Sequence, residues 1–184
     1  APASFTLQNG IPVHLWTRRE LPLVTAQVLF TAGPVLTTPA TAGLTGLTAT
    51  MLGEGAGDRD ALAFAAAIQA LGGRISFGAN HESASASLFV LGRNFESGVG
   101  LLADALQRPR LEAKDWERVH RLHLDDLRQA DDEPNSVAGR VGMRMLYGEQ
   151  NPYGWSAGGT VATVTKLTLD DVRRERARVF APGH

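Results

Sequence analysis

Two histidines and an aspartate, His120, His123 and Asp126, follow one another at three-residue spacing in a segment with helical character. Residues three apart on a helix are neighbours, so His123 and Asp126 would lie side by side. Two imidazoles and one carboxylate suit a divalent transition metal, which makes a metal site one hypothesis, with His81 as an alternative ligand to Asp126. Arginines and acids surround these histidines, and this pattern favours a solvated helix face over a metal site.

Other residue types that could do chemistry lack the spacing that a reaction needs. Ser83, Ser85 and Ser87 alternate along an expected strand and lack the strand-to-helix elbow of a serine hydrolase. The glycine-rich stretch 53–57 has no GK[ST] ending, so it is better explained as a helix terminator than as a phosphate loop. The chain contains no cysteine, which excludes disulfides, thiolate zinc ligands and cysteine nucleophiles.

The composition is that of an ordinary globular protein. Of 184 residues, 43% are hydrophobic and 20% are charged, too apolar a mixture for intrinsic disorder. Lys and Arg number 18 against 19 Asp and Glu, so no cationic excess exists to neutralise phosphates, and no nucleic-acid partner is expected. No apolar run approaches the ~20 residues of a transmembrane helix, so no membrane span is expected.

Alternating and β-branched apolar residues predict five strands. The dipeptide Asn9-Gly10 tolerates positive φ and predicts a tight hairpin between the first two. The runs with strand character are Phe5–Gln8, Ile11–Trp16, Leu23–Phe30 (ending at Gly33-Pro34), Arg74–Ala79 and His81–Leu91.

Helical patterns fill the rest of the chain. The first helix follows the loop Thr37–Thr41 and runs through Met51-Leu52. We expect Asp58 to cap the second helix, which ends at Gly72-Gly73. Its buried face is expected to carry Leu62, Ala65, Ala66, Ile68 and Leu71. The later helices are predicted at Asn94–Gln107, Ala113–Ala130, Pro134–Leu146 and Leu169–Phe180.

The order of these elements indicates the fold class. Three strands, two helices, two strands and then helices show no regular β-α-β alternation. We therefore predict an α+β fold, a mostly antiparallel β-sheet covered by α-helices on one face. No internal repeat or low-complexity tail divides the chain, so residues 1–184 are expected to form a single domain.

Several segments, taken together and in order, resemble the pitrilysin/insulinase family of zinc peptidases, which includes the mitochondrial processing peptidase. The opening FTLQNGIPVHLWTRRELPLVTAQVLFTAG resembles the family's first hairpin and third strand, and Gly43–Gly57 resembles its zinc-site helix. Asn151-Pro152-Tyr153-Gly154 and the run Lys166–Val172 resemble its closing segment. The resemblance implies the half-subunit fold of these metallopeptidases.

Active members of this family carry an inverted zinc motif, H-x-x-E-H, in which two histidines hold zinc and the glutamate activates the bound water. Aligned on the family, the histidine positions fall at Gly46 and Thr50, and the glutamate position falls at Ala49. The family's third ligand, a glutamate on a later helix, falls at Asp126. Catalytic zinc needs about three protein ligands plus a water, so the resemblance implies the fold without catalytic residues, metal or cofactor.

The resemblance also implies partners. Family peptidases enclose substrates between two similar halves or subunits, of which often only one keeps the zinc motif. We therefore expect a non-catalytic, peptidase-like domain that forms a peptide-binding chamber with an active zinc peptidase subunit or with a second half of the same chain. That second half would begin beyond Gly183-His184, zinc would belong to the active partner only, and the substrate would be an extended peptide.

Two alternatives stay open at this stage. One is a structural or assembly module of a larger complex, as some family members are. The other is a zinc metalloendopeptidase whose metal has moved to His120, His123 and Asp126, which would also need a new general base. The compartment is not indicated, since both the cytoplasm and a bacterial cell envelope would suit the sequence.

Overall fold

The computed structural model describes residues 2–18, 20–31 and 38–180. The expectations that fall on Gly33-Pro34, on Thr37 and on the last four residues, including Gly183-His184, lie outside these ranges.

The strands are β1 (Ala3–Thr6), β2 (Pro12–Leu15), β3 (Leu23–Phe30), β4 (Gly55–Ala56), β5 (Arg59–Asp60), β6 (Arg74–Ala79) and β7 (Ala84–Leu91). The α-helices are α1 (Leu44–Leu52), α2 (Ala61–Ala70), α3 (Phe95–Gln107), α4 (Ala113–Asp132), α5 (Pro134–Tyr147), α6 (Val161–Val164) and α7 (Leu169–Val179). Short 3₁₀ turns are η2 (Pro39–Thr41), η3 (Gly92–Asn94) and η4 (Pro152–Gly154).

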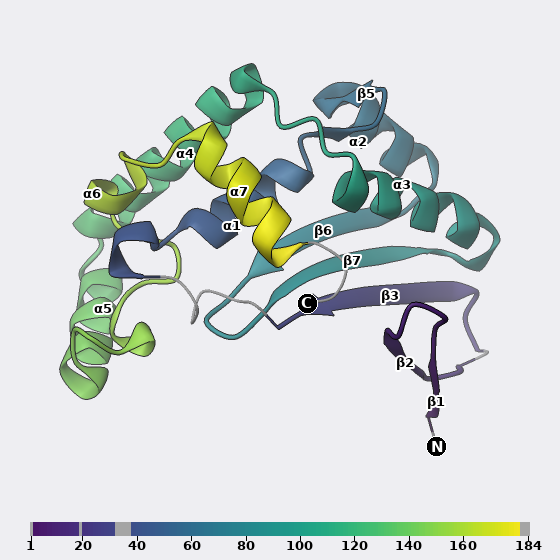
Figure 1. The fold of residues 1–184 in the computed structure, drawn as a ribbon, viewed down its shortest axis with the longest axis horizontal. Helices are drawn as coiled ribbons and strands as arrows, with labels where there is room; N and C mark the ends of the chain where they lie inside the picture. The colour runs from purple at the N-terminus through teal and green to yellow at the C-terminus, as the bar shows by residue number, and fades with distance from the viewer. Residues whose placement is uncertain (1, 19, 32–37, 181–184) are drawn as a thin grey trace.

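The central sheet has the strand order β3-β7-β6, and both pairings are antiparallel. Strand β7 alternates along its length, because every second residue from Ala84 to Val90 is buried while the residues between them are more exposed. The buried side faces the helices, and Figure 1 shows the helices gathered on one side of the sheet. This arrangement confirms the predicted α+β fold with one helix-covered face.

Strands β1 and β2 form a separate hairpin rather than extending the sheet. Gly10 adopts a φ of +87° in the connecting turn, as the Asn9-Gly10 dipeptide predicts. In Figure 1 this hairpin stands apart from the three-stranded sheet. Its apolar side chains, such as Phe5 and Leu15, are about half exposed, since no layer of the described chain covers them fully.

Three apolar clusters hold the layers together. The first joins the inner face of β7 to α1 and α7, the second joins α1 to α4, and the third lies beneath α2 and α3. Helix α1 contributes to the first two clusters, through Leu52 and through Leu47 and Met51, so it lies at the centre of the core. None of the helices in the described part of the chain combines the length and apolar character needed to cross a bilayer.

A buried polar contact fixes α7 against α1. The Thr45 hydroxyl donates to Glu175 Oε1 at 2.6 Å, and Arg178 donates to both carboxylate oxygens of Glu175 at 2.8 Å. Thr45 and Glu175 are both buried. The hydrogen bond from Thr45 and the ion pair with Arg178 together offset the cost of burying the Glu175 carboxylate. The hydrogen bond with Glu175 also raises the pKa of Arg178.

The second helix differs most from its prediction. Asp60, not Asp58, is the N-cap, because the Asp60 carboxylate accepts from Ala63 N at 2.9 Å. Phe64 is the buried residue of α2, whereas Leu62 is 83% exposed, and Ala65 and Ala66 are exposed as well. The predicted buried face was therefore wrong at Leu62, Ala65 and Ala66, whereas Ile68 and Leu71 are partly buried and pack against the same core cluster as Phe64. The strands β4 and β5, which pair antiparallel within and just after the glycine-rich stretch, were not predicted, and neither was the short helix α6.

Candidate functional site

Helix α1 places Gly46 and Thr50 on one face, one turn apart. Gly43 is the N-cap of this helix, where φ is +95° and an added Cβ would lie 2.7 Å from the carbonyl oxygen of Gly158. A Cβ at Gly46 would meet only open space, and Thr50 is exposed. The Thr50 hydroxyl donates to the Gly46 carbonyl at 3.2 Å, so the only side-chain oxygen of this pair already has a partner in the helix backbone.

Ala49 lies on a different side of α1 from this open face. It is 1% exposed and belongs to the apolar cluster that includes Leu52 and Leu88. A methyl group in this environment can neither accept nor hold a proton. Nothing at position 49 can therefore serve as a general base.

Asp126 lies on α4, the helix that packs against α1 through Leu47, Met51 and Val119. Its side chain is exposed. Over the described ranges, no three histidine, aspartate or glutamate side chains lie close enough together to hold a metal ion. Catalytic zinc takes about three nitrogen, sulfur or carboxylate ligands, so a glycine, an engaged threonine hydroxyl and one exposed aspartate do not fit it.

The histidines of α4 contact backbone carbonyls across the fold. His120 Nε2 lies 2.8 Å from the Val164 carbonyl oxygen, and its ring stacks on Trp116 at a centroid distance of 4.7 Å. His123 Nε2 lies 2.8 Å from the Gly158 carbonyl oxygen. Both histidines are partly buried, so the expectation of a solvated face was wrong. They join α4 to the segment around α6, and the structure does not bring them together with Asp126 as a metal-binding group.

His81 occupies a third, separate place. Its Nε2 lies 3.3 Å from the Trp155 carbonyl oxygen, and its ring stacks on Tyr153 at 5.3 Å. The Tyr153 hydroxyl donates to Glu82 at 2.8 Å, and this hydrogen bond raises the pKa of Tyr153. These contacts join the β6–β7 turn to η4. The partners of His81 therefore differ from those of His120 and His123.

A cavity of about 320 Å³ lies beside the N-terminal end of α1. Ala42, Trp155, Thr160 and Thr163 contribute to its wall, which thus offers an aromatic ring and two hydroxyls. The Thr163 hydroxyl also contacts the carbonyl oxygen of Ala42 at 3.3 Å, so the wall is continuous with the start of α1. Reasoning from the sequence missed this cavity, because its residues come from segments more than 100 positions apart.

Comparisons with known proteins agree with this architecture. A family model described as insulinase (peptidase family M16) matches residues 17–152. A protein from Streptomyces coelicolor named as an uncharacterized zinc protease is 25% identical over 179 residues, covering 97% of this chain and 39% of its own length. The crystal structure of a peptidase M16 inactive domain from Pseudomonas fluorescens is similar at a TM-score of 0.91 and 26% identity, covering 100% of this chain and 44% of that chain.

A protease from Helicobacter pylori shares the fold, at a TM-score of 0.89 and 16% identity over 99% of this chain and 44% of that chain. The chain thus spans less than half of the length of each of these relatives. The family model, by contrast, covers well over half of the chain. From its sequence and its fold, the chain belongs to the insulinase family of peptidases, peptidase family M16.

Proposed function

We propose that this chain is a non-catalytic half of an M16 peptidase and forms part of a peptide-binding chamber whose zinc belongs to an active partner subunit or to another half. The observation that carries the proposal is the composition of α1 at the three positions where the resemblance puts the family's zinc motif. Gly46, Ala49 and Thr50 supply neither zinc ligands nor a base, in a helix that is otherwise packed as a normal part of the core.

Two further observations support the proposal. The similar chain from Pseudomonas fluorescens is itself described as an inactive M16 domain, and the match covers all of this chain and 44% of that one. More than half of each relative's length lies outside the match, which is enough for a second unit of similar size. In this proposal the single domain of residues 1–184 corresponds to one such unit.

Binding of an extended peptide is supported by the sheet. Strand β3 pairs only with β7, and so does β6, so within the described chain both outer strands of the sheet have one unpaired edge. An extended peptide can add to such an edge through backbone hydrogen bonds, which give affinity that tolerates many sequences. The cavity lined by Trp155, Thr160 and Thr163 offers a place for a side chain of the bound peptide.

The proposal is tested by separating peptide binding from peptide cleavage. The purified chain is incubated with zinc and with an unstructured peptide that carries a fluorophore and a quencher. A second sample of the same peptide carries the fluorophore alone. We expect its fluorescence anisotropy to show binding, while the peptide with the quencher shows no cleavage. Turnover that a chelator abolishes, and that stays with the chain through successive purification steps, would contradict the proposal.

A further inference from the structure

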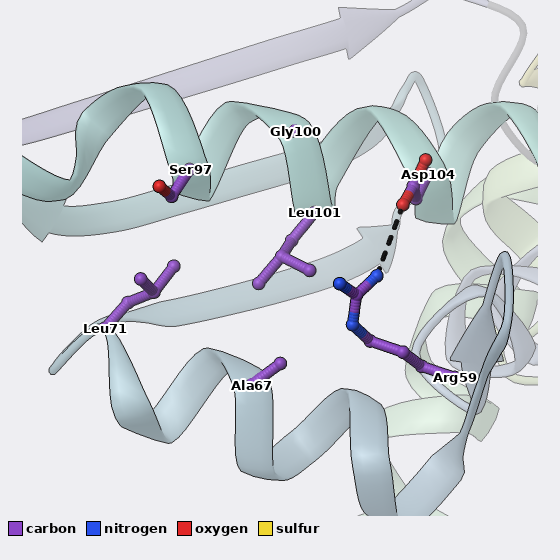
Figure 2. Close-up of a pocket in the computed structure, with 7 residues that line it drawn as sticks. All are labelled: Arg59, Ala67, Leu71, Ser97, Gly100, Leu101 and Asp104. Carbon is purple, nitrogen blue, oxygen red and sulfur yellow. Dashed lines mark ion pairs between the residues drawn. The ribbon is translucent and has the colours of Figure 1, made fainter.

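A groove of about 410 Å³ runs between α2 and α3, away from the motif positions on α1. Figure 2 shows its two helical walls, with Ser97 near one end of α3 and Asp104 near the other. These two residues are seven positions apart, so the groove is about 10 Å long at 1.5 Å per residue. None of its residues takes part in the proposed non-catalytic role.

The floor of the groove is apolar. Leu101 is buried and belongs to the core cluster of Phe64 and Ala105, and Ala67 and Leu71 pack against the same cluster. In Figure 2 the Leu101 side chain points from α3 into the space above α2. An aliphatic group lying in the groove would therefore continue the hydrophobic core outward and lose its own contact with water.

Arg59 lies at one end of the groove, and its guanidinium group has N–H donors that the described residues leave free to bind a ligand. Its Nη1 lies 3.6 Å from Asp104 Oδ2, and the structure shows no hydrogen bond donated by this guanidinium within the described chain. The side chain is 45% exposed. Asp104 is already paired with Arg108, whose Nη2 donates to Asp104 Oδ1 at 2.7 Å and whose pKa this hydrogen bond raises. Asp58 acts on Arg108 as well, so Arg59 is the guanidinium of this group whose N–H groups have no hydrogen-bonded carboxylate within the described chain, and Figure 2 shows it beside the groove.

Gly100 keeps the middle of the groove open. Glycine disfavours a helix interior relative to alanine, and a Cβ added at Gly100 would meet nothing within 4 Å. The neighbouring Gly98 differs, because its added Cβ would lie 3.0 Å from the Leu88 side chain. A side chain at position 98 would therefore press on Leu88, whereas one at position 100 would meet no neighbour, and the missing side chain there leaves room above Leu101.

We propose that this groove binds a carboxylate that carries an apolar tail. The guanidinium of Arg59 would pair with the carboxylate, since arginine's planar fork matches two carboxylate oxygens. The tail would lie along Leu101 and Ala67 toward Leu71. A free aliphatic acid and the carboxyl terminus of a peptide that ends in an apolar residue share this chemistry, and each has its own arm in the test.

The test uses the whole chain and two-dimensional NMR titrations with octanoate, with octanol, and with the tripeptide Ala-Ala-Leu as free acid and as amide. For so small a ligand we expect millimolar affinity, with saturable shifts confined to the amides around the groove. The neutral octanol should bind about tenfold more weakly than octanoate, because it lacks the charge-assisted bonds to Arg59. Preference for octanoate would indicate a free acid as the source, and preference for the tripeptide acid over its amide would indicate a peptide terminus.

Two variants address the two parts of the groove. Arg59→Gln should weaken binding about tenfold, and Gly100→Leu should abolish it by filling the groove while raising helix propensity. Gly142→Leu on α5 is the matched control, because a Cβ there also meets open space and lies on another helix. Equal binding of charged and neutral ligands, unchanged binding by Gly100→Leu, or no saturable binding by any of the four compounds would overturn the proposal.

Discussion

The substitution Ala49→Glu places a carboxyl group at the position where active family members are expected to hold their general base. In this chain that position is 1% exposed and is packed with Leu52 and Leu88. Thr50→Glu is the matched control, because the next residue of the same helix is exposed to solvent. The pair compares the same new side chain inside and outside the core.

The expected cost follows from two terms. Forcing extra methylenes into a packed core costs about 1–3 kcal/mol, and a buried carboxyl without a partner costs about 1–3 kcal/mol more. Ala49→Glu should therefore lower the free energy of unfolding by about 4 kcal/mol, a large part of the 5–15 kcal/mol typical of a domain. Thr50→Glu should cost only about 0.5 kcal/mol, as surface changes do.

Urea unfolding followed by circular dichroism measures both values. Burial should raise the pKa of the introduced carboxyl above that in the unfolded chain, about 4.3. The cost of ionisation is then absent below about pH 4 and grows as the pH rises through the raised pKa of the folded state. The destabilisation by Ala49→Glu should thus be larger at pH 7 than at pH 4. Equal losses for Ala49→Glu and Thr50→Glu would refute the burial of position 49.

Two further predictions concern α7. A hydrogen bond from the Thr168 hydroxyl lowers the pKa of Asp171, so this carboxylate stabilises the fold above its unfolded pKa of about 3.9 and loses that effect as the pH falls through its lowered folded pKa. Asp171→Asn should lower the free energy of unfolding by about 0.5–1 kcal/mol at pH 7 and by almost nothing near pH 2. Urea unfolding at several pH values would measure this difference. A difference that is constant with pH would contradict this reasoning. Glu175→Ala should cost about 3 kcal/mol, because it leaves the Thr45 hydroxyl buried without its partner and Arg178 unpaired, whereas Glu175→Gln should keep part of the contact and cost less. Similar losses in the two Glu175 variants would speak against the buried carboxylate as the organising group.

The regular elements could be predicted from the sequence wherever one pattern dominates. Leu23–Phe30 and Arg74–Ala79 agree with their predicted bounds, because alternating side chains and flanking turn residues mark both ends. The long helix α4 was also predicted, since its apolar residues recur at helical spacing between charged ones. These are local signals, and the structure preserves them.

Helix α2 shows where such signals end. Its sequence ALAFAAAIQA is apolar almost throughout, so spacing alone cannot distinguish the buried side from the exposed one. Packing on the sheet and on α3 selects Phe64 for the core and leaves Leu62 in solvent. The N-cap is Asp60 instead of the predicted Asp58, because β4 and β5 form a small hairpin before the helix starts. A glycine-rich stretch does not indicate such a pairing.

The candidate site likewise has parts that could be predicted from the sequence and parts that could not. The helical spacing that places Gly46 and Thr50 on one face could be foreseen, and the resemblance alone directed attention to it. The contacts of His120 and His123 could not, because their carbonyl partners lie 44 and 35 positions further along the chain. A charged neighbourhood in sequence suggested solvent, whereas tertiary packing places both rings against the segment around α6.

The most direct test of the central claim is the zinc content of the purified chain after saturation with zinc and dialysis, measured by mass spectrometry. Gly46→His/Thr50→His is the positive control, because it adds two imidazoles one turn apart on an open helix face. We predict no stoichiometric zinc on the natural chain and measurable retention by this variant. Stoichiometric zinc on the natural chain, lost when Asp126 is replaced by alanine, would contradict the account.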